Sequence, residues 1–324
     1  MADVKPPRVR GTDPEPDEDR AQLILITGLT LAVILVAVVL LLNTVIYTEN
    51  LATRGVDAGG ADAVDFRDGA AEDVAAIMER EHRNENASGD VVANFTASTA
   101  VYADTVAGLR ARDGVIADID VRSINRGYFI AQEPLDDGSR RNMTDPDGIE
   151  DWTVAGNTTR TRAYQLTVSA ESLAGADSFS VVATRPNETW SMSLSDGPTT
   201  GEINVTVDNG TEAVTETFAD PGDGNHTIDV TGGTVNGEPF EALVWAENVQ
   251  TGTDDYDVRY ENGDEAVGTY SLVVDDRDGG AEFDRPTRPY IVEGVYSAEI
   301  AVSRQTPELE YSDVVRVAPG ERDA

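Results

Sequence analysis

One stretch of sequence constrains this chain more than any other. Residues 23–42 read LILITGLTLAVILVAVVLLL, a run of twenty positions without a charged side chain, and the apolar character extends to Tyr47. A helix rises about 1.5 Å per residue, so this run matches the hydrocarbon core of a bilayer, about 30 Å thick. A signal peptide has a shorter apolar region, closely followed by a small-residue cleavage site, and no such site follows closely here. We therefore expect one transmembrane helix over residues 22–47.

The basic residues around the run predict its orientation. Four precede it and two follow it closely: Lys5, Arg8, Arg10 and Arg20, then Arg54 and Arg67. Cytoplasmic flanks carry the excess of Lys and Arg, so we expect a cytoplasmic N-terminus and an extracellular remainder. Residues 1–21, rich in Pro and charge, are expected to form a disordered cytoplasmic tail or leader.

The charge balance excludes several function classes. The chain has 60 acidic and 24 basic residues, a net charge of −36, and its single lysine is Lys5. Such a chain does not bind nucleic acid through a general basic surface. The absence of cysteine excludes disulfides, Cys-ligated metals and a Cys nucleophile. Acid excess with almost no lysine resembles the proteins of extreme halophiles, haloarchaea in particular, because molar salt shortens the Debye length to about 3 Å.

Residues 48–132 are expected to form a helical membrane-proximal region. Glycines 55, 59 and 60 predict the end of the helix that leaves the membrane. Two sets of apolar residues then follow helical spacing, the second with Asp90 as its N-cap. The first set is Phe66, Ala70, Val74, Ile77 and Met78, and the second is Val91, Phe95, Tyr102, Val106 and Leu109. We expect the two helices to pack as a hairpin or against the next domain. Ile119, Val121 and residues 128–130 are expected to form short strands.

A polar linker over residues 133–151 precedes a region with a period of two. Six runs alternate apolar and polar residues, and Asx-Gly turn signals separate them, which predicts an antiparallel β-sandwich over residues 152–318 with a short tail at 319–324. The runs begin at Tyr164, Trp190, Ile203, Tyr256, Tyr270 and Tyr296. Trp152, Trp190 and Trp245 are expected to anchor the sandwich core. The predicted class is α+β: one N-terminal transmembrane helix, a helical hairpin and a sandwich-like ectodomain.

Eight Asn-x-Ser/Thr sequons occur, and none precedes the apolar run. They are at Asn86, Asn94, Asn142, Asn157, Asn187, Asn204, Asn209 and Asn225. Because N-glycosylation marks the outward-facing surface, the sequons agree with the orientation inferred from charge. The competing explanation is that an acidic, Thr-rich chain contains sequons by composition alone.

Arg20-Ala21-Gln22-Leu23, at the start of the apolar run, resembles an archaeal class III, type IV prepilin-like signal. The resemblance implies cleavage between Ala21 and Gln22 by a prepilin-type peptidase, and a helix that anchors the subunit and packs in a filament. It covers about 30 residues, and Ile26 stands where these signals commonly have an acidic residue. The run from Leu41 to Arg54 also resembles a group of uncharacterised haloarchaeal surface proteins. The alternative is an uncleaved signal-anchor.

Few residues suggest catalysis or metal binding. Three acidic loops, at 145–151, 220–225 and 275–284, offer oxygen ligands but lack the EF-hand spacing, so we expect solvated loops and no metal. His82 and His226 lie in no nucleophile motif, and there is no phosphate-binding loop. We expect no cofactor and no enzymatic activity.

Two function classes remain. The first is a pilin-like or cell-envelope structural subunit that associates with itself, or with pilus or envelope components, through its N-terminal helix. Gly28 and Ala32, at i and i+4, would then form the contact, because small residues let helices approach closely in lipid. The second is a monomeric tethered module that binds an extracellular protein, glycan or ion.

Overall fold

A computed structural model describes residues 16–84, 90–277 and 289–320. Within the first helix it describes side chains for residues 27–39 and from residue 59 onward. The chain divides into two compact units, residues 1–61 and residues 62–324. The predicted tail, residues 1–21, lies largely outside the described part.

Helix α1 runs without a break from Pro16 to Arg83, a length of 68 residues. The prediction that glycines 55, 59 and 60 end a helix is therefore wrong. A glycine inside a helix costs about 1 kcal/mol relative to alanine, which weakens a helix without ending it. No proline follows Pro16 before residue 134, so every later backbone N–H of the helix can be used.

Helix α2 (Val91–Arg112) begins where the sequence predicts. The Asp90 carboxylate accepts hydrogen bonds from the backbone N–H groups of Val92 and Ala93, at 3.0 and 3.2 Å. These bonds satisfy N–H groups that have no partner in the first turn, which makes Asp90 the N-cap.

The strands form two sheets, and every strand pair in the described residues is antiparallel. In spatial order, the first sheet contains β11 (Glu238–Pro239), β10 (Thr234–Val235), β9 (Asn225–Asp229), β4 (Thr161–Ser169), β13 (Val267–Val274), β1 (Ile116–Gln132), β14 (Tyr290–Gln305) and β15 (Glu310–Val317), with β2 (Arg141–Asn142) also paired to β13. The second contains β3 (Trp152–Thr158), β12 (Tyr256–Glu261), β5 (Phe179–Arg185), β6 (Glu188–Asp196), β7 (Ile203–Asp208) and β8 (Ala213–Phe218). Two short 3-10 helices, Ala170–Leu173 and Gly263–Glu265, complete the described elements.

The α+β class and the sandwich-like arrangement are confirmed. One hydrophobic core joins the inward side chains of both sheets, including those of the five predicted alternating runs in β4, β6, β7, β12 and β13. Trp190 is fully buried, Trp152 is 8% exposed, and Trp245 packs against the same core from a partly buried position. The tryptophans therefore anchor the sandwich, as the sequence predicts.

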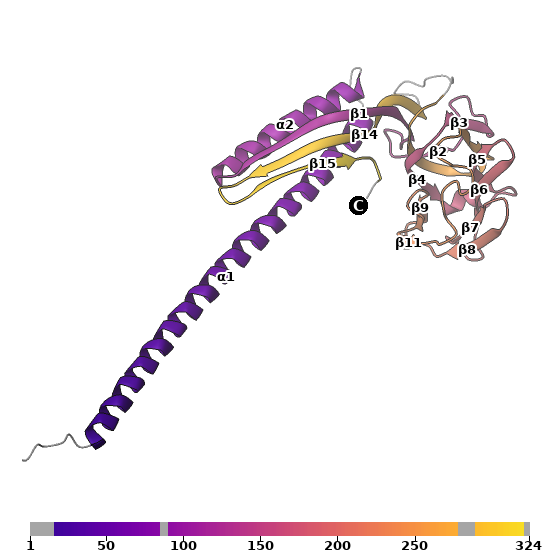
Figure 1. The fold of residues 1–324 in the computed structure, drawn as a ribbon. Helices are drawn as coiled ribbons and strands as arrows, with labels where there is room; N and C mark the ends of the chain where they lie inside the picture. Colours follow the sequence, from indigo (N-terminus) through magenta and orange to yellow (C-terminus); the bar gives the residue numbers. More distant parts are fainter. Residues whose placement is uncertain (1–15, 85–89, 278–288, 321–324) are drawn as a thin grey trace, which may run out of the picture. The chain divides into compact units, whose positions relative to one another are not determined.

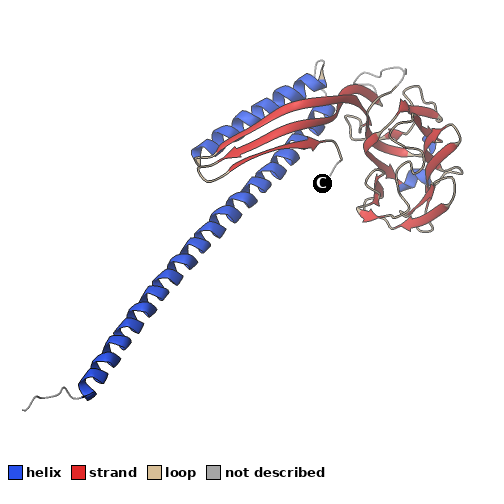
Figure 2. Ribbon diagram, in the orientation of Figure 1, coloured by secondary structure: helices blue, strands red, loops and turns tan. Residues whose placement is uncertain are grey.

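A second core lies between the two helices and the long strands β1, β14 and β15 (Figure 1). Figure 2 shows the helices on one face of this three-stranded ribbon. The sixth alternating run, in β14, turns its apolar residues into this core, apart from Tyr296, which belongs to a small third cluster. The predicted strand positions, Ile119, Val121 and residues 128–130, are confirmed, but the prediction that these strands are short is wrong, because all belong to β1, one strand of 17 residues. It pairs with β14 along its length, with irregularities after Val121 and Asn125.

Candidate functional site

The most unusual surface of the described chain lies on α1 between residues 27 and 39. Eight large apolar side chains there are 45–63% exposed: Leu29, Leu31, Val33, Ile34, Leu35, Val36, Val38 and Val39. Successive helical residues point about 100° apart, so these side chains surround the whole helix. A helix that is apolar all round needs an apolar environment on every side.

The predicted helix-contact residues lie within this segment. Gly28 and Ala32 are exposed, and apart from its chain neighbours and the adjacent helix backbone, no atom lies within 4 Å of the position that a Cβ at Gly28 would take. Ala21 and Gln22 have a helical backbone, and their side chains lie outside the described residues. In the part of the chain that the structure describes, no helix meets the length and hydropathy needed for a membrane span.

The other end of α1 belongs to the core of the second unit. The predicted apolar face is confirmed: Phe66, Ala70, Val74, Ile77 and Met78 are at most 8% exposed. They share a core with Val315 and Val317 of β15. One helix therefore contains the exposed apolar segment and also supplies core residues to the unit of residues 62–324.

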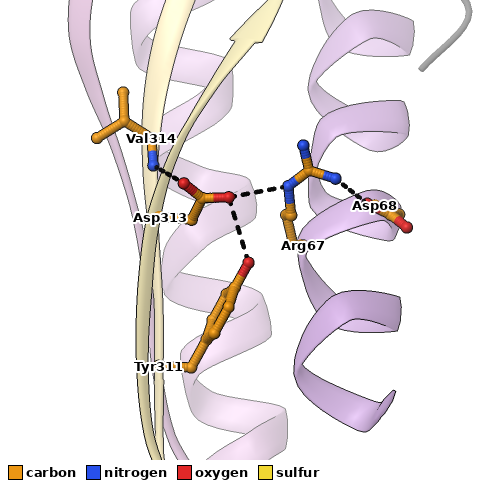
Figure 3. A network of polar contacts seen from close by, with 5 residues as sticks. All are labelled: Arg67, Asp68, Tyr311, Asp313 and Val314. Atoms are coloured by element: carbon orange, nitrogen blue, oxygen red, sulfur yellow. Dashed lines mark hydrogen bonds and ion pairs between the residues drawn. The ribbon is translucent and has the colours of Figure 1, made fainter. Parts of the chain in front are cut away.

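An ion pair with its neighbouring hydrogen bonds joins α1 to strand β15 (Figure 3). The Nε of Arg67 donates to Oδ2 of Asp313 at 3.0 Å, and its NH1 donates to Asp68 at 2.6 Å. The hydroxyl of Tyr311 donates to the same Asp313 oxygen at 3.3 Å, while the other oxygen accepts the Val314 backbone N–H at 2.8 Å. The hydrogen bond to Asp68 is the main cause that raises the pKa of Arg67. The network directs the Arg67 guanidinium at the strand.

Two buried polar residues tie the end of α1 to its neighbours. The Nε2 of His82 accepts the backbone N–H of Val295 at 3.0 Å, and its ring stacks on Phe129 with centroids 5.0 Å apart. Glu81, 4% exposed, accepts a hydrogen bond from Ser98 of α2 at 2.9 Å. Burial acts to raise the pKa of Glu81, but hydrogen bonds, led by that from Arg80, outweigh it and lower the pKa. Glu81 therefore stays ionised and joins the two helices.

Carboxylates of the three acidic loops accept hydrogen bonds from backbone N–H groups, in their own loop or in a neighbouring turn. Oδ1 of Asp145 accepts from the N–H groups of residues 147 and 149, and Oδ1 of Asp220 from those of Gly222 and Gly224. The two glycine N–H groups hold the pKa of Asp220 below its ordinary value. Asp275 accepts from the backbone N–H groups of residues 159 and 160. No cluster of metal-ligand residues occurs among the described residues.

His226 has a structural position. It is fully buried, its Nε2 lies 2.8 Å from the carbonyl oxygen of Gly201, and its Nδ1 lies 3.0 Å from the side-chain nitrogen of Asn236. Both ring nitrogens are therefore used in joining loops, and neither faces a nucleophile in these contacts.

Seven of the eight sequons lie in the described residues, and Asn86 lies outside them. Their asparagines are exposed or half-buried: Asn94, Asn142, Asn157, Asn187, Asn204, Asn209 and Asn225.

The sequence analysis did not predict the contacts of Asp313 and Tyr311. The alternation of residues 310–317 could have predicted a strand, but no local signal indicates that Asp313 faces Arg67.

A groove lies between α1 and α2, with a volume of about 660 Å³. The apolar residues Ile77, Ala97 and Val101 and the charged residues Asp73 and Arg80 line it. Val101 is 67% exposed, so the groove offers apolar surface to solvent.

The comparisons with known proteins add a family. A family model described as "Family of unknown function (DUF7261)" matches residues 17–184, just over half of the chain. No curated protein and no solved structure matches the chain.

Proposed function

Because the chain belongs to DUF7261, a family of unknown function, we propose a role from its own physical features. We propose a membrane-anchored surface protein of a halophile, whose residues 62–324 stand outside the cell. Its role is that of a structural subunit, pilin-like or of the cell envelope, and its outer surface is N-glycosylated.

The observation that carries this proposal is the composition of α1. Its segment of residues 27–39 exposes apolar side chains all round, which suits lipid or the interior of a helix bundle. Its C-terminal part supplies core residues to the second unit, from Phe66 to Met78. The same helix is thus both the proposed anchor and part of the domain core. This continuity suits a subunit that assembles through its helix, whereas a tethered binding module needs only a linker between its anchor and its domain.

The prepilin-like signal extends the proposal. Cleavage between Ala21 and Gln22 by a prepilin-type peptidase would leave a chain that begins with the apolar helix itself. Gly28 and Ala32, both exposed, would then be the helix-contact positions. The partners are membrane lipid and other subunits of the same assembly.

The groove between α1 and α2 favours a second candidate function. A tethered module that binds an extracellular protein, glycan or ion could use that apolar surface, with the lining charges of Asp73 and Arg80 for specificity. On that alternative the protein is a monomer and the helix is only an anchor.

Topology and the mature N-terminus test the proposal together. Protease added to intact cells should remove residues beyond about position 50, and an N-terminal reporter should be protected. Mass spectrometry of the membrane-extracted protein should find a mature chain that begins at Gln22. A protease-resistant C-terminal half in intact cells would refute the location. An intact N-terminus with a monomeric protein would favour the binding module.

A further inference from the structure

The sequons of this chain are not equivalent once it is folded. In N-glycosylation the asparagine Nδ2 attacks the anomeric carbon of a sugar held on a lipid phosphate. A nitrogen–carbon bond forms, the carbon–oxygen bond to the lipid phosphate breaks, and Nδ2 loses a proton. The transferase must reach the asparagine and the hydroxyl residue two positions later. An acceptor in a folded chain therefore needs three consecutive exposed residues and a free Nδ2.

Five of the seven described sequons fail this requirement at their middle residue. Those middle residues are all 0% exposed: Phe95, Met143, Thr158, Val205 and His226. In three of the five, the asparagine Nδ2 also donates to a backbone carbonyl, at 3.1 Å or less. These asparagines are Asn142, Asn204 and Asn225. A transferase could modify these three asparagines only after the strands or loops around them unfold.

Asn209 fails for a different reason. Its Nδ2 donates to Oε2 of Glu247 at 2.9 Å, and its Oδ1 accepts the N–H groups of Thr211 and Glu212 at 3.0 and 2.9 Å. Both ends of this side-chain amide are therefore used, Oδ1 within the β7–β8 turn and Nδ2 by the carboxylate of Glu247.

Asn187 meets every part of the requirement. It lies at the tip of the β5–β6 hairpin, and all three residues of its sequon, Asn187, Glu188 and Thr189, are exposed. Its φ of 70° is the left-handed conformation that asparagine adopts readily in tight turns. No described residue hydrogen-bonds its side chain. The Thr189 hydroxyl has one contact, to the hydroxyl of Thr184, at 3.4 Å, the outer limit of a hydrogen bond.

We propose that Asn187 is the N-glycosylated residue among the seven described sequons, and that the donor is a lipid-phosphate-linked oligosaccharide. The proposal rests on the extracellular location given under Proposed function. The glycan extends from one hairpin tip of the second sheet, and the other six described asparagines stay unmodified because the folded chain either hydrogen-bonds their Nδ2 or buries the residue that follows them.

The test is glycopeptide mass spectrometry of the full chain purified from the membranes in which it is naturally made. We expect the glycan mass on the Asn187 peptide and none on the peptides of the other six. Asn187→Gln and Thr189→Ala should each abolish it, and Thr189→Ser should retain it. Asn209→Gln, also at a turn, is the matched control and should leave the glycan unchanged.

Two results would overturn the assignment: a bare Asn187, or a glycan on any other described sequon. Protease shaving of the same cells separates this failure from failure of the proposed function. If residues 62–324 are removed from outside and Asn187 is bare, the location stands and the site assignment is wrong. If those residues are protected, both are wrong.

Discussion

The attachment of α1 to the sheet offers the sharpest test, because an ion pair and an apolar core both contribute to it. The Arg67–Asp313 pair has an N···O distance of 3.0 Å, and the two side chains are 27% and 43% exposed. Exposed pairs of this kind contribute about 0.2–1 kcal/mol, and less in salt. Arg67 also retains Asp68 as a partner. Asp313→Asn should therefore reduce the free energy of unfolding by about 0.5 kcal/mol or less.

Burial predicts that Met78 contributes much more than Asp313 to the free energy of unfolding. It is 0% exposed in the core that α1 shares with β15. Truncation of a buried methionine to alanine costs about 2–5 kcal/mol, because apolar contact is lost and a cavity remains. Met78→Ala should therefore destabilise the protein several times more than Asp313→Asn. Val314→Thr, on an exposed and β-branched residue of the same strand, is the control and should change stability by about 0.5 kcal/mol at most.

The assay is urea denaturation of the full chain in detergent at constant molar salt, followed by tryptophan fluorescence. Urea is required because guanidinium is itself a salt and would screen the ion pair. If the variants share the same slope m of unfolding free energy against urea concentration, their midpoints can be compared directly as stabilities. If Asp313→Asn destabilised as much as Met78→Ala, the polar network would dominate, and the argument from burial would be refuted.

Three further predictions follow from charge, protonation and helix contact. With a net charge of −36, the urea midpoint should fall as salt drops from molar to about 0.1 M, where the Debye length reaches about 10 Å, and an unchanged midpoint would count against halophilic adaptation. Folding lowers the pKa of Glu81. Its carboxylate therefore stabilises the folded protein at pH values above its unfolded pKa, about 4.3, and this stabilisation is lost as the pH falls through the folded pKa. The Glu81→Gln variant should therefore be less stable than wild type at pH 7, and the difference between their urea midpoints should be smaller at pH 3. An equal difference at the two pH values would refute the claim that ionised Glu81 stabilises the fold. Replacing Gly28 and Ala32 by Leu should reduce self-association, measured by crosslinking, while the protein still inserts into the membrane. Equal self-association of the variant and wild type would refute the prediction that these two residues form the helix contact.

The features that the sequence predicts well are local. The alternation in β4, β6, β7, β12 and β13 is visible residue by residue, and the Asp90 cap acts within its own turn. The buried tryptophans follow from the same patterns.

The features that the sequence does not predict are set by distant partners. The length of β1 depends on β14, more than 150 positions later, because the polar residues between Val121 and Tyr128 become a strand by pairing with it. The continuation of α1 through its glycines is likewise invisible to local helix rules. For the candidate acceptor site, the motif identifies eight asparagines, but only the folded chain distinguishes Asn187 from those whose neighbours are buried.

The contact between Arg67 and Asp313 joins residues 246 positions apart. A chain made from its N-terminus exposes the apolar face of α1 long before β15 exists to cover it. Contacts of such sequence separation slow folding, because the intervening chain must be ordered first. The helix core can close only after residue 317 has emerged, so a chain truncated before β15 leaves that core open and prone to aggregate. The last strand thus sets the moment at which folding can finish, and a chaperone that shields residues 66–78 until then would raise the yield of native protein.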